Sequence, residues 1–372
     1  MNSNRNRNPR LVPYLTIALI LLTGLSVACG GYSQSMPVVT PPPPAVRVAY
    51  VANSLDHTIS VFSIDNTTGN LNGTTQVPAG GDSPVTVALH PSGRFAYVAN
   101  RASNNISVFA IDPNTRALTI VGTPATTGSH PRSLTLDPSG KFAYSANQDS
   151  GDISAFSINQ STGALTSVGP PALSEDKPFS VTIDPAGRFL YALNLNSNSI
   201  SVFAIDGISG ALSAVGDPVP DASGPSSIAI DPAGHFAYVS NAFSDDISVF
   251  RIDPATGLLT AIGPNTPGGN SPLSVKVSPS GLFLFVANLE SNDVSVFKID
   301  TTTGALTPIA TVPAGTGPDA VTTDITGHFL YVTNFTSSSV SVYSISDTGT
   351  LTPITSLAQT GQGAISITTT IK

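Results

Sequence analysis

The sequence predicts an all-β fold, a seven-bladed β-propeller with four antiparallel strands in each blade. First, the 372 residues contain a (Tyr/Phe)-(Val/Ser/Ala)-x-Asn stretch seven times, and the closing Asn recurs at spacings of 47 residues, with 46 for the last. Second, the 32 Gly and 31 Pro favour many turns over long helices. A period of this length holding four short strands matches one propeller blade. The repeated Asn residues are Asn53, Asn100, Asn147, Asn194, Asn241, Asn288 and Asn334.

Each repeat contains the same elements in the same order. It starts with Pro-x-Ser-(Val/Ile/Leu), which predicts the first strand, and a turn such as Asp137-Pro138-Ser139-Gly140 follows. Asp, Pro and Gly at the first, second and fourth positions are typical of a type I turn. The aromatic stretch ending in Asn predicts the second strand and Ile-Ser-Val-Phe the third. A Thr-Gly-x-Leu turn then leads into the fourth strand.

The two ends of the repeat array predict how the ring closes. Residues 46–78 supply a second, third and fourth strand but no first strand. Residues 363–369 (Gly-Ala-Ile-Ser-Ile-Thr-Thr) match the first-strand segment at 318–324. We therefore expect a C-terminal strand to join the N-terminal blade, which would hide two strand edges.

The N-terminal segment has the order of an export signal. Arg5, Arg7 and Arg10 precede an apolar run over residues 11–28, and small residues then lead to the lone Cys29. This junction resembles the lipobox of bacterial lipoproteins, in which the cysteine is acylated. The alternatives are a plain signal peptide or an uncleaved anchor. Under each of them the body lies outside the cytoplasm.

Three segments follow from this interpretation. They are a lipoprotein-type signal peptide at residues 1–28, a Pro-rich linker at 29–45 and the propeller at 46–372. The expected location is outside the cytoplasm, as a membrane-anchored lipoprotein in the periplasm or on the cell surface.

The composition argues against several classes of partner and cofactor. The chain has 15 Lys and Arg against 23 Asp and Glu, a net charge of -8, so no nucleic-acid partner is expected. A single cysteine excludes an intrachain disulfide, a thiolate zinc site and C-x-x-C-H haem attachment. No two histidines have metal-binding spacing, and the Asp of Ile-Asp-x-x-Thr-Gly is expected to accept Asx-turn hydrogen bonds rather than to bind Ca²⁺. We expect neither a metal nor a cofactor.

Residues that break the repeat are the candidates for function. In a four-stranded meander, the loops between blades and the loops from the second to the third strand emerge on one face, which we call the mouth face. Two neighbouring inter-blade loops supply the candidate catalytic residues His130, Arg132, Glu175, Asp176 and Lys177. Asp319 enters from a blade across the ring as a candidate binding residue. The alternative is that these side chains are ordinary solvated loop charges.

Other polar residues are expected farther out on the mouth face. They are Asp82, Arg101, Gln148, Asp149 and Glu290. The seven repeated Asn residues also fall on this face. Because they occur in every blade, we expect them to satisfy the loops rather than to bind a ligand.

The repeat resembles that of the seven-bladed lactonase propellers, similar to 6-phosphogluconolactonase and the carboxymuconate cycloisomerases, with Tyr-Val-Thr-Asn-type repeats. The motifs are Tyr331-Val332-Thr333-Asn334, Gly-Arg-Phe-Leu-Tyr at 187–191 and Thr-Gly-Ala-Leu at 162–165. Ser129-His130-Pro131-Arg132 is similar to the family's Gly-x-His-Pro-His segment, with Arg132 in place of the second His. The resemblance implies a lactonase-like fold over residues 46–372, and a functional role for His130 and Asp152.

Two functions fit these observations. In the first, a carboxylic-ester (lactone) hydrolase, His130 or one of Glu175 and Asp176 activates water, while Arg132 and Lys177 stabilise the oxyanion. In the second, a non-catalytic propeller presents its loops to an envelope polymer or a partner protein. Whether the protein is an enzyme stays open at this point, as does the identity of its small lactone or envelope partner.

Replacing Cys29 with Ser tests the lipoprotein interpretation. Because only the thiol can accept the lipid, Cys29→Ser should abolish acylation and reduce partition into the membrane. Mass spectrometry of the N-terminal peptide measures the lipid, and stable anchoring requires more than one acyl chain. A wild-type peptide without lipid mass, together with unchanged membrane partition of the variant, would contradict the interpretation.

Overall fold

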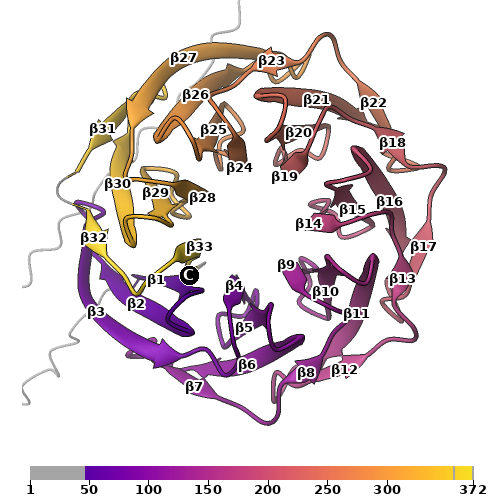
Figure 1. Cartoon of the computed structure of the whole chain (residues 1–372), viewed down its shortest axis with the longest axis vertical. Coiled ribbons are helices and arrows are strands. Elements are labelled where there is room, and N and C mark those ends of the chain that lie inside the picture. Colours follow the sequence, from indigo (N-terminus) through magenta and orange to yellow (C-terminus); the bar gives the residue numbers. More distant parts are fainter. Residues whose placement is uncertain (1–46, 355–356, 371–372) are drawn as a thin grey trace, which may run out of the picture. The chain divides into compact units, whose positions relative to one another are not determined.

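The computed structural model describes residues 47–354 and 357–370, all within one compact unit, Ala45–Lys372. The described residues form seven antiparallel sheets arranged in a ring, and none of them is helical (Figure 1). The predicted seven-bladed all-β propeller is therefore confirmed. The predicted signal peptide, the linker and Cys29 lie outside the described residues.

Each blade contributes an innermost strand that borders the central channel. These strands are β4 (Pro84–Leu89), β9 (Pro131–Leu136), β14 (Pro178–Ile183), β19 (Pro225–Ile230), β24 (Pro272–Val277), β28 (Pro318–Thr323) and β33 (Ala364–Thr369). The second strands are β1 (Arg47–Asn53), β5 (Phe95–Asn100), β10 (Phe142–Asn147), β15 (Phe189–Asn194), β20 (Phe236–Asn241), β25 (Phe283–Asn288) and β29 (Phe329–Asn334). The third strands are β2 (Thr58–Ile64), β6 (Asn105–Ile111), β11 (Asp152–Ile158), β16 (Ser199–Ile205), β21 (Asp246–Ile252), β26 (Asp293–Ile299) and β30 (Ser339–Ile345).

The outermost strand differs between blades. It is continuous in two of them, as β3 (Leu71–Pro78) and β27 (Leu306–Pro313). In the other five it is split into the pairs β7 (Leu118–Ile120) and β8 (Ala125–Thr126), β12 (Leu165–Ser167) and β13 (Ala172–Leu173), β17 (Leu212–Ala214) and β18 (Val219–Pro220), β22 (Leu259–Ala261) and β23 (Thr266–Pro267), and β31 (Leu351–Pro353) and β32 (Ala358–Gln359). Four of these splits contain a Gly at positive φ with a Pro one or two residues later, a combination that interrupts a strand.

The ring closes as the sequence predicts. Strand β33 pairs antiparallel with β1, with Tyr50 opposite Thr368 and Ala52 opposite Ser366. In Figure 1 the yellow C-terminal strand lies beside the indigo N-terminal strands. The closing blade therefore has the order β3-β2-β1-β33, and its first strand comes from the opposite end of the chain.

Tyrosine hydroxyls join neighbouring blades. The Tyr97 hydroxyl in β5 donates to the Gly163 carbonyl in the Thr-Gly-x-Leu turn of the next blade, at 3.0 Å. Tyr191 binds the Gly257 carbonyl in the same way at 2.9 Å, and Tyr144 and Tyr331 repeat the contact. Since a buried hydroxyl needs a partner, this bond fixes these four turns against their preceding blades.

The glycine of that turn is required for two reasons. Gly257 has a φ of +75°, and a Cβ placed there would lie 2.5 Å from the Phe189 ring of the preceding blade. One turn departs from this pattern, because Arg116 replaces the glycine at a φ of 61°. The preceding blade carries Val48 where the others carry Phe, which leaves room for a side chain at this position.

A matched pair of glycine variants separates the two requirements. Gly263 lies in the same blade at a φ of +64°, but nothing lies within 4 Å of its added Cβ. Gly263→Ala should therefore cost only the backbone strain, about 1 kcal/mol. Gly257→Ala should cost roughly 1–3 kcal/mol more, because its methyl group must displace Phe189. Urea unfolding measures both, and equal losses of stability would show that packing against Phe189 is unimportant.

Candidate functional site

A β-bulge opens the innermost strand of every blade. In β9, Pro131 pairs with Asn147 and Ser133 pairs with Ala146, so Arg132 is the extra residue. A bulge takes one residue out of the ladder and redirects its side chain. The same register shift occurs in all seven blades, at Val85, Arg132, Phe179, Ser226, Leu273, Asp319 and Ile365.

Five of these bulge residues line a cavity of about 480 Å³ on the mouth face, which we call the mouth cavity. Arg132, Asp319 and Phe179 are among them, with Val85 and Ile365. Residues that follow the repeated Asn complete most of the wall, namely Ser54, Arg101, Gln148, Leu289 and Phe335, together with Leu55 and Ser83. The volume falls within the range of small-molecule sites.

The only charged bulge residues are Arg132 and Asp319, and both reach the mouth cavity. The Arg132 guanidinium lies over the Phe179 ring, 4.5 Å from its centroid. Within residues 47–354 and 357–370, no side-chain hydrogen bond or ion pair engages either the Arg132 guanidinium or the Asp319 carboxylate. Five donors and a carboxylate are therefore available to a ligand or to water.

Burial sets the protonation behaviour of this pair. It raises the pKa of Asp319 to about 6, and the Arg132 charge acts in the opposite direction. Burial also lowers the pKa of Arg132, and Asp319 raises it again. At pH 7 the cavity therefore presents a guanidinium and a carboxylate that ionises close to neutrality.

A second cluster, the rim cluster, consists of His130, Asp149 and Lys177. Asp149 Oδ2 binds His130 Nδ1, and its Oδ1 accepts a hydrogen bond from Lys177 Nζ at 2.6 Å. The bonds from Lys177 and His130 lower the pKa of Asp149. The three side chains are 32–39% exposed, which puts them at the surface rather than in the mouth cavity. Gln148 connects the rim cluster to the mouth cavity, because it directly precedes Asp149 in the sequence and lines the cavity.

The remaining candidates make contacts within the loops. Glu175 accepts a hydrogen bond from the Ser199 hydroxyl at 2.7 Å, and Asp176 accepts one from Asn196 Nδ2 at 3.0 Å. Asp152 accepts a hydrogen bond from Asn147 Nδ2 at 2.6 Å. Neither these three residues nor Lys177 lines the mouth cavity. The structure thus divides the predicted site residues into a cavity pair, a rim cluster and loop contacts.

The repeated Asn residues have the structural role that we expected, with different partners. Asn147 donates to Asp152 and to Ser154, five and seven residues later, and every blade repeats this geometry. The amide therefore ties the second strand to the third through side chains more than through loop backbone. Asp152 belongs to this repeated contact.

Sequence reasoning placed Asp149 on the mouth face but did not include it among the site residues, and it missed Phe179. The signal for Phe179 was present in the repeat, since it occupies the same position as Arg132 and Asp319. For Asp149 no such signal existed. Its importance comes from two partners in two different blades.

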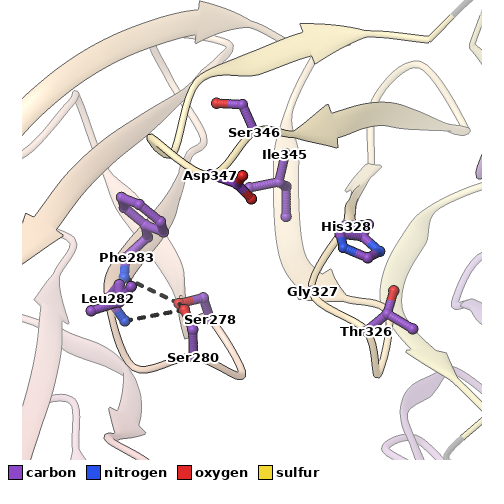
Figure 2. Close-up of a pocket in the computed structure, with 10 residues that line it drawn as sticks. All are labelled: Ser278, Ser280, Leu282, Phe283, Thr326, Gly327, His328, Ile345, Ser346 and Asp347. Atoms are coloured by element: carbon purple, nitrogen blue, oxygen red, sulfur yellow. Dashed lines mark hydrogen bonds between the residues drawn. The ribbon is translucent and has the colours of Figure 1, made fainter.

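The opposite face carries the repeated turns. Asp184 Oδ1 accepts hydrogen bonds from the amides of Arg188 and Phe189, and Asp65 Oδ1 accepts from Thr67 and Thr68, as an Asx turn requires. A cavity of about 240 Å³ lies on this face, lined by residues of three turns. Figure 2 shows its wall, where Ser278 and Ser280 accept hydrogen bonds from backbone amides. His328 and Asp347 both lie on its wall, and no hydrogen bond or ion pair joins their side chains within the described residues.

Two further properties concern the described residues alone. No group of three or more His, Cys, Asp or Glu side chains among them could hold a metal ion. These residues also contain no helix that is long and apolar enough to cross a membrane.

Comparison with known proteins identifies the family. The model of the lactonase family, described as a seven-bladed β-propeller, matches residues 43–173, 168–221 and 213–322. The chain belongs to this lactonase family. The match covers the inter-blade loops of the rim cluster and Arg132, and it extends to Asp319. No curated protein matches the sequence.

Solved structures resemble this lactonase-family propeller over nearly their whole length. A candidate 6-phosphogluconolactonase of Bacteroides fragilis is 23% identical, with a TM-score of 0.78, over 89% of this chain and 100% of the other. The periplasmic gluconolactonase PpgL of Pseudomonas aeruginosa is 19% identical, with a TM-score of 0.76, over 87% and 99%. Hydrazine synthase of Kuenenia stuttgartiensis is 22% identical, with a TM-score of 0.63, over 84% and 99%. At these identities the likeness concerns the fold alone.

A double-mutant cycle tests the rim cluster. His130→Ala and Lys177→Ala should have non-additive effects on the thermal midpoint, because both side chains bind the Asp149 carboxylate. Arg132→Ala combined with Lys177→Ala should be additive, since Arg132 faces the mouth cavity instead.

The same cycle has a pH dependence. A lowered pKa of Asp149 means that its stabilising contribution is present above the ordinary carboxyl pKa and is lost as the pH falls through the lowered value. The coupling between His130 and Lys177 should therefore disappear well below about pH 4. Additive effects of His130→Ala and Lys177→Ala at pH 7 would contradict the shared carboxylate.

Proposed function

We propose that this protein is a lactone hydrolase whose reaction takes place in the mouth cavity. Membership of the lactonase family supports the reaction class. The observation that carries the proposal concerns a guanidinium and a carboxylate, Arg132 and Asp319, on the wall of one cavity. Neither side chain has a hydrogen bond or ion pair among the described residues.

The chemistry of a lactone fits these two groups. Arg132 binds the ester carbonyl oxygen and stabilises the negative charge that develops there when water attacks. Asp319 accepts a proton from the attacking water as the new carbon–oxygen bond forms. The ring carbon–oxygen bond then breaks, and the ring oxygen takes up a proton. The product is a hydroxy acid, and neither a metal nor a redox partner is needed to balance the step.

The lining of the mouth cavity favours a lactone without a phosphate group. Leu55, Val85, Phe179, Leu289, Phe335 and Ile365 make half of the wall apolar. Arg101 donates to Gln148 Oε1 at 3.3 Å, and Asp319 adds a negative charge. A phosphate group would need a more strongly cationic wall than Arg101 and Arg132 provide beside Asp319.

The rim cluster supports an accessory role. Asp149 binds Nδ1 of His130, which orients the imidazole and leaves Nε2 free to exchange protons with solvent. We therefore assign His130 and Lys177 to substrate entry and proton exchange rather than to the attack on the carbonyl.

The proposed location is outside the cytoplasm, with a lipid anchor at Cys29. The charged N-terminus, the apolar run and the cysteine junction in the sequence support it. The related PpgL is described as periplasmic, which agrees with this location.

The pH profile tests Asp319 as the base. Because burial raises the pKa of Asp319 to about 6, kcat/KM for a hydrolysed lactone should fall as the pH drops through about 6. In Asp319→Asn this acidic limb should vanish and turnover should drop, by roughly 10²–10⁴-fold. An unchanged limb in Asp319→Asn would assign the titration to another group.

Arginine variants test the working face. Arg132→Ala should lower kcat about 10²–10³-fold, as expected for the loss of an oxyanion partner. The control Arg188→Ala removes a guanidinium on the opposite face, where Arg188 donates to the Pro254 carbonyl at 2.7 Å, and should retain full activity. Equal losses in the two folded variants would refute the choice of face.

The non-catalytic alternative has its own outcome. A purified wild-type protein that hydrolyses no member of a broad lactone panel, yet binds one of them with loss of binding in Arg132→Ala, would make the mouth cavity a binding site only.

A further inference from the structure

A second cavity lies at the other end of the central channel. Its volume is about 340 Å³, and its wall comes from the last residues of four consecutive innermost strands, β19, β24, β28 and β33, and from the turns that follow β19, β24 and β28. The mouth cavity is instead lined by residues at the starts of innermost strands. We call this second cavity the turn-end cavity.

Three polar side chains stand at one level of its wall. Lys276, Thr322 and Thr368 are each the fifth residue of their strand, and they lie opposite Phe285, Tyr331 and Tyr50 in the neighbouring strands. In the other four innermost strands this position holds Ala88, Thr135, Thr182 and Ala229. Lys276 is therefore the one charged side chain at this level of the ring.

These three groups have no protein partners. Within the part of the chain that the structure describes, no hydrogen bond or ion pair involves Lys276 Nζ or the hydroxyls of Thr322 and Thr368. The acid on the same wall, Asp324, is already engaged. Arg47 binds it at 3.1 Å, and it accepts hydrogen bonds from the amides of His328 and Phe329.

An ammonium group in this position needs an anion. Burial lowers the pKa of Lys276, as expected when a cation is removed from water without a counterion. An unpaired buried charge is costly, so a bound anion would recover that cost. The hydroxyls of Thr322 and Thr368, on the wall of the same cavity, can donate hydrogen bonds to that anion.

We propose that the turn-end cavity is a binding site for a small organic carboxylate, with Lys276 as its counterion and Thr322 and Thr368 as hydrogen-bond donors. One ammonium matches the single charge of a carboxylate, whereas phosphate, with up to two charges, is held in proteins by more donors or by arginine forks. The volume leaves room for a carbon skeleton of a few atoms beyond the carboxylate.

This proposal is independent of the proposed function. The turn-end cavity shares no residue with the mouth cavity. Loss of lactone hydrolysis would leave it untouched, and its own test measures binding rather than turnover.

Calorimetry on the full chain with acetate, gluconate and inorganic phosphate tests the site. We expect one carboxylate to bind per chain, and Lys276→Met to weaken that binding about tenfold or more, as for the loss of a charged hydrogen bond. The control Lys298→Met removes an exposed ammonium from strand β26 of the same blade and should bind normally. A double change, Thr322→Val with Thr368→Val, should weaken binding while keeping the charge.

Amine labelling of the wild-type protein provides a second measurement that needs no variant. An acetylating reagent should modify Lys276 less in the presence of the carboxylate, while Lys298 should be labelled equally in both conditions. Absence of protection at Lys276, or equal binding by Lys276→Met, would overturn the proposal. Tighter binding of phosphate than of either carboxylate would overturn the choice of ligand class.

Discussion

The β-bulge at the start of each innermost strand is the constraint on which the mouth cavity depends. A regular ladder would hold the residue after Pro within the pleat, where it would pack between blades. The extra residue breaks that alternation and turns one side chain per blade toward the channel. Arg132 and Asp319 can face one cavity from distant blades because both occupy this position. Because a bulge residue contributes no ladder hydrogen bond, its side chain can be replaced with little effect on the stability of the blade.

Much of the fold could be predicted from the sequence, because its period repeats a complete structural unit. The phase of that period was enough to predict that residues 363–369 complete the N-terminal blade, and β33 confirms it. The split outer strands were not predicted. In the sequence, two very short strands separated by a Gly and a Pro cannot be distinguished from an ordinary loop. The site was predictable only in outline. Arg132 and Asp319 were expected near the mouth, whereas the bond network of Asp149 depends on where two loops of different blades meet.

The contacts between blades explain why the scaffold residues vary so little. Four of the Thr-Gly-x-Leu turns, at Gly69, Gly163, Gly210 and Gly257, receive both a phenylalanine ring and a tyrosine hydroxyl from the blade before them, so a change at one position requires a change at another. Val48 and Arg116 illustrate this dependence: the smaller residue in one blade permits the larger residue in the next. Side-chain pairs on the mouth face, such as Lys177 with Asp149, join exposed loops and not the packed strands, so chemistry can vary there without loss of the ring.

Closure of the ring by its last strand also governs the order of folding. The amide of Val48 donates to the hydroxyl of Thr370 across 322 positions of the sequence, among the most distant pairings in the chain. Such a contact cannot form until synthesis is complete, whereas the six blades between can assemble from contiguous segments as they emerge. The edge of β1, which β33 covers in the closed ring, therefore stays unpaired longest. A chain that lacks its last ten residues would carry an open strand edge able to pair with another copy. Only a chain synthesised to its end can therefore close the ring.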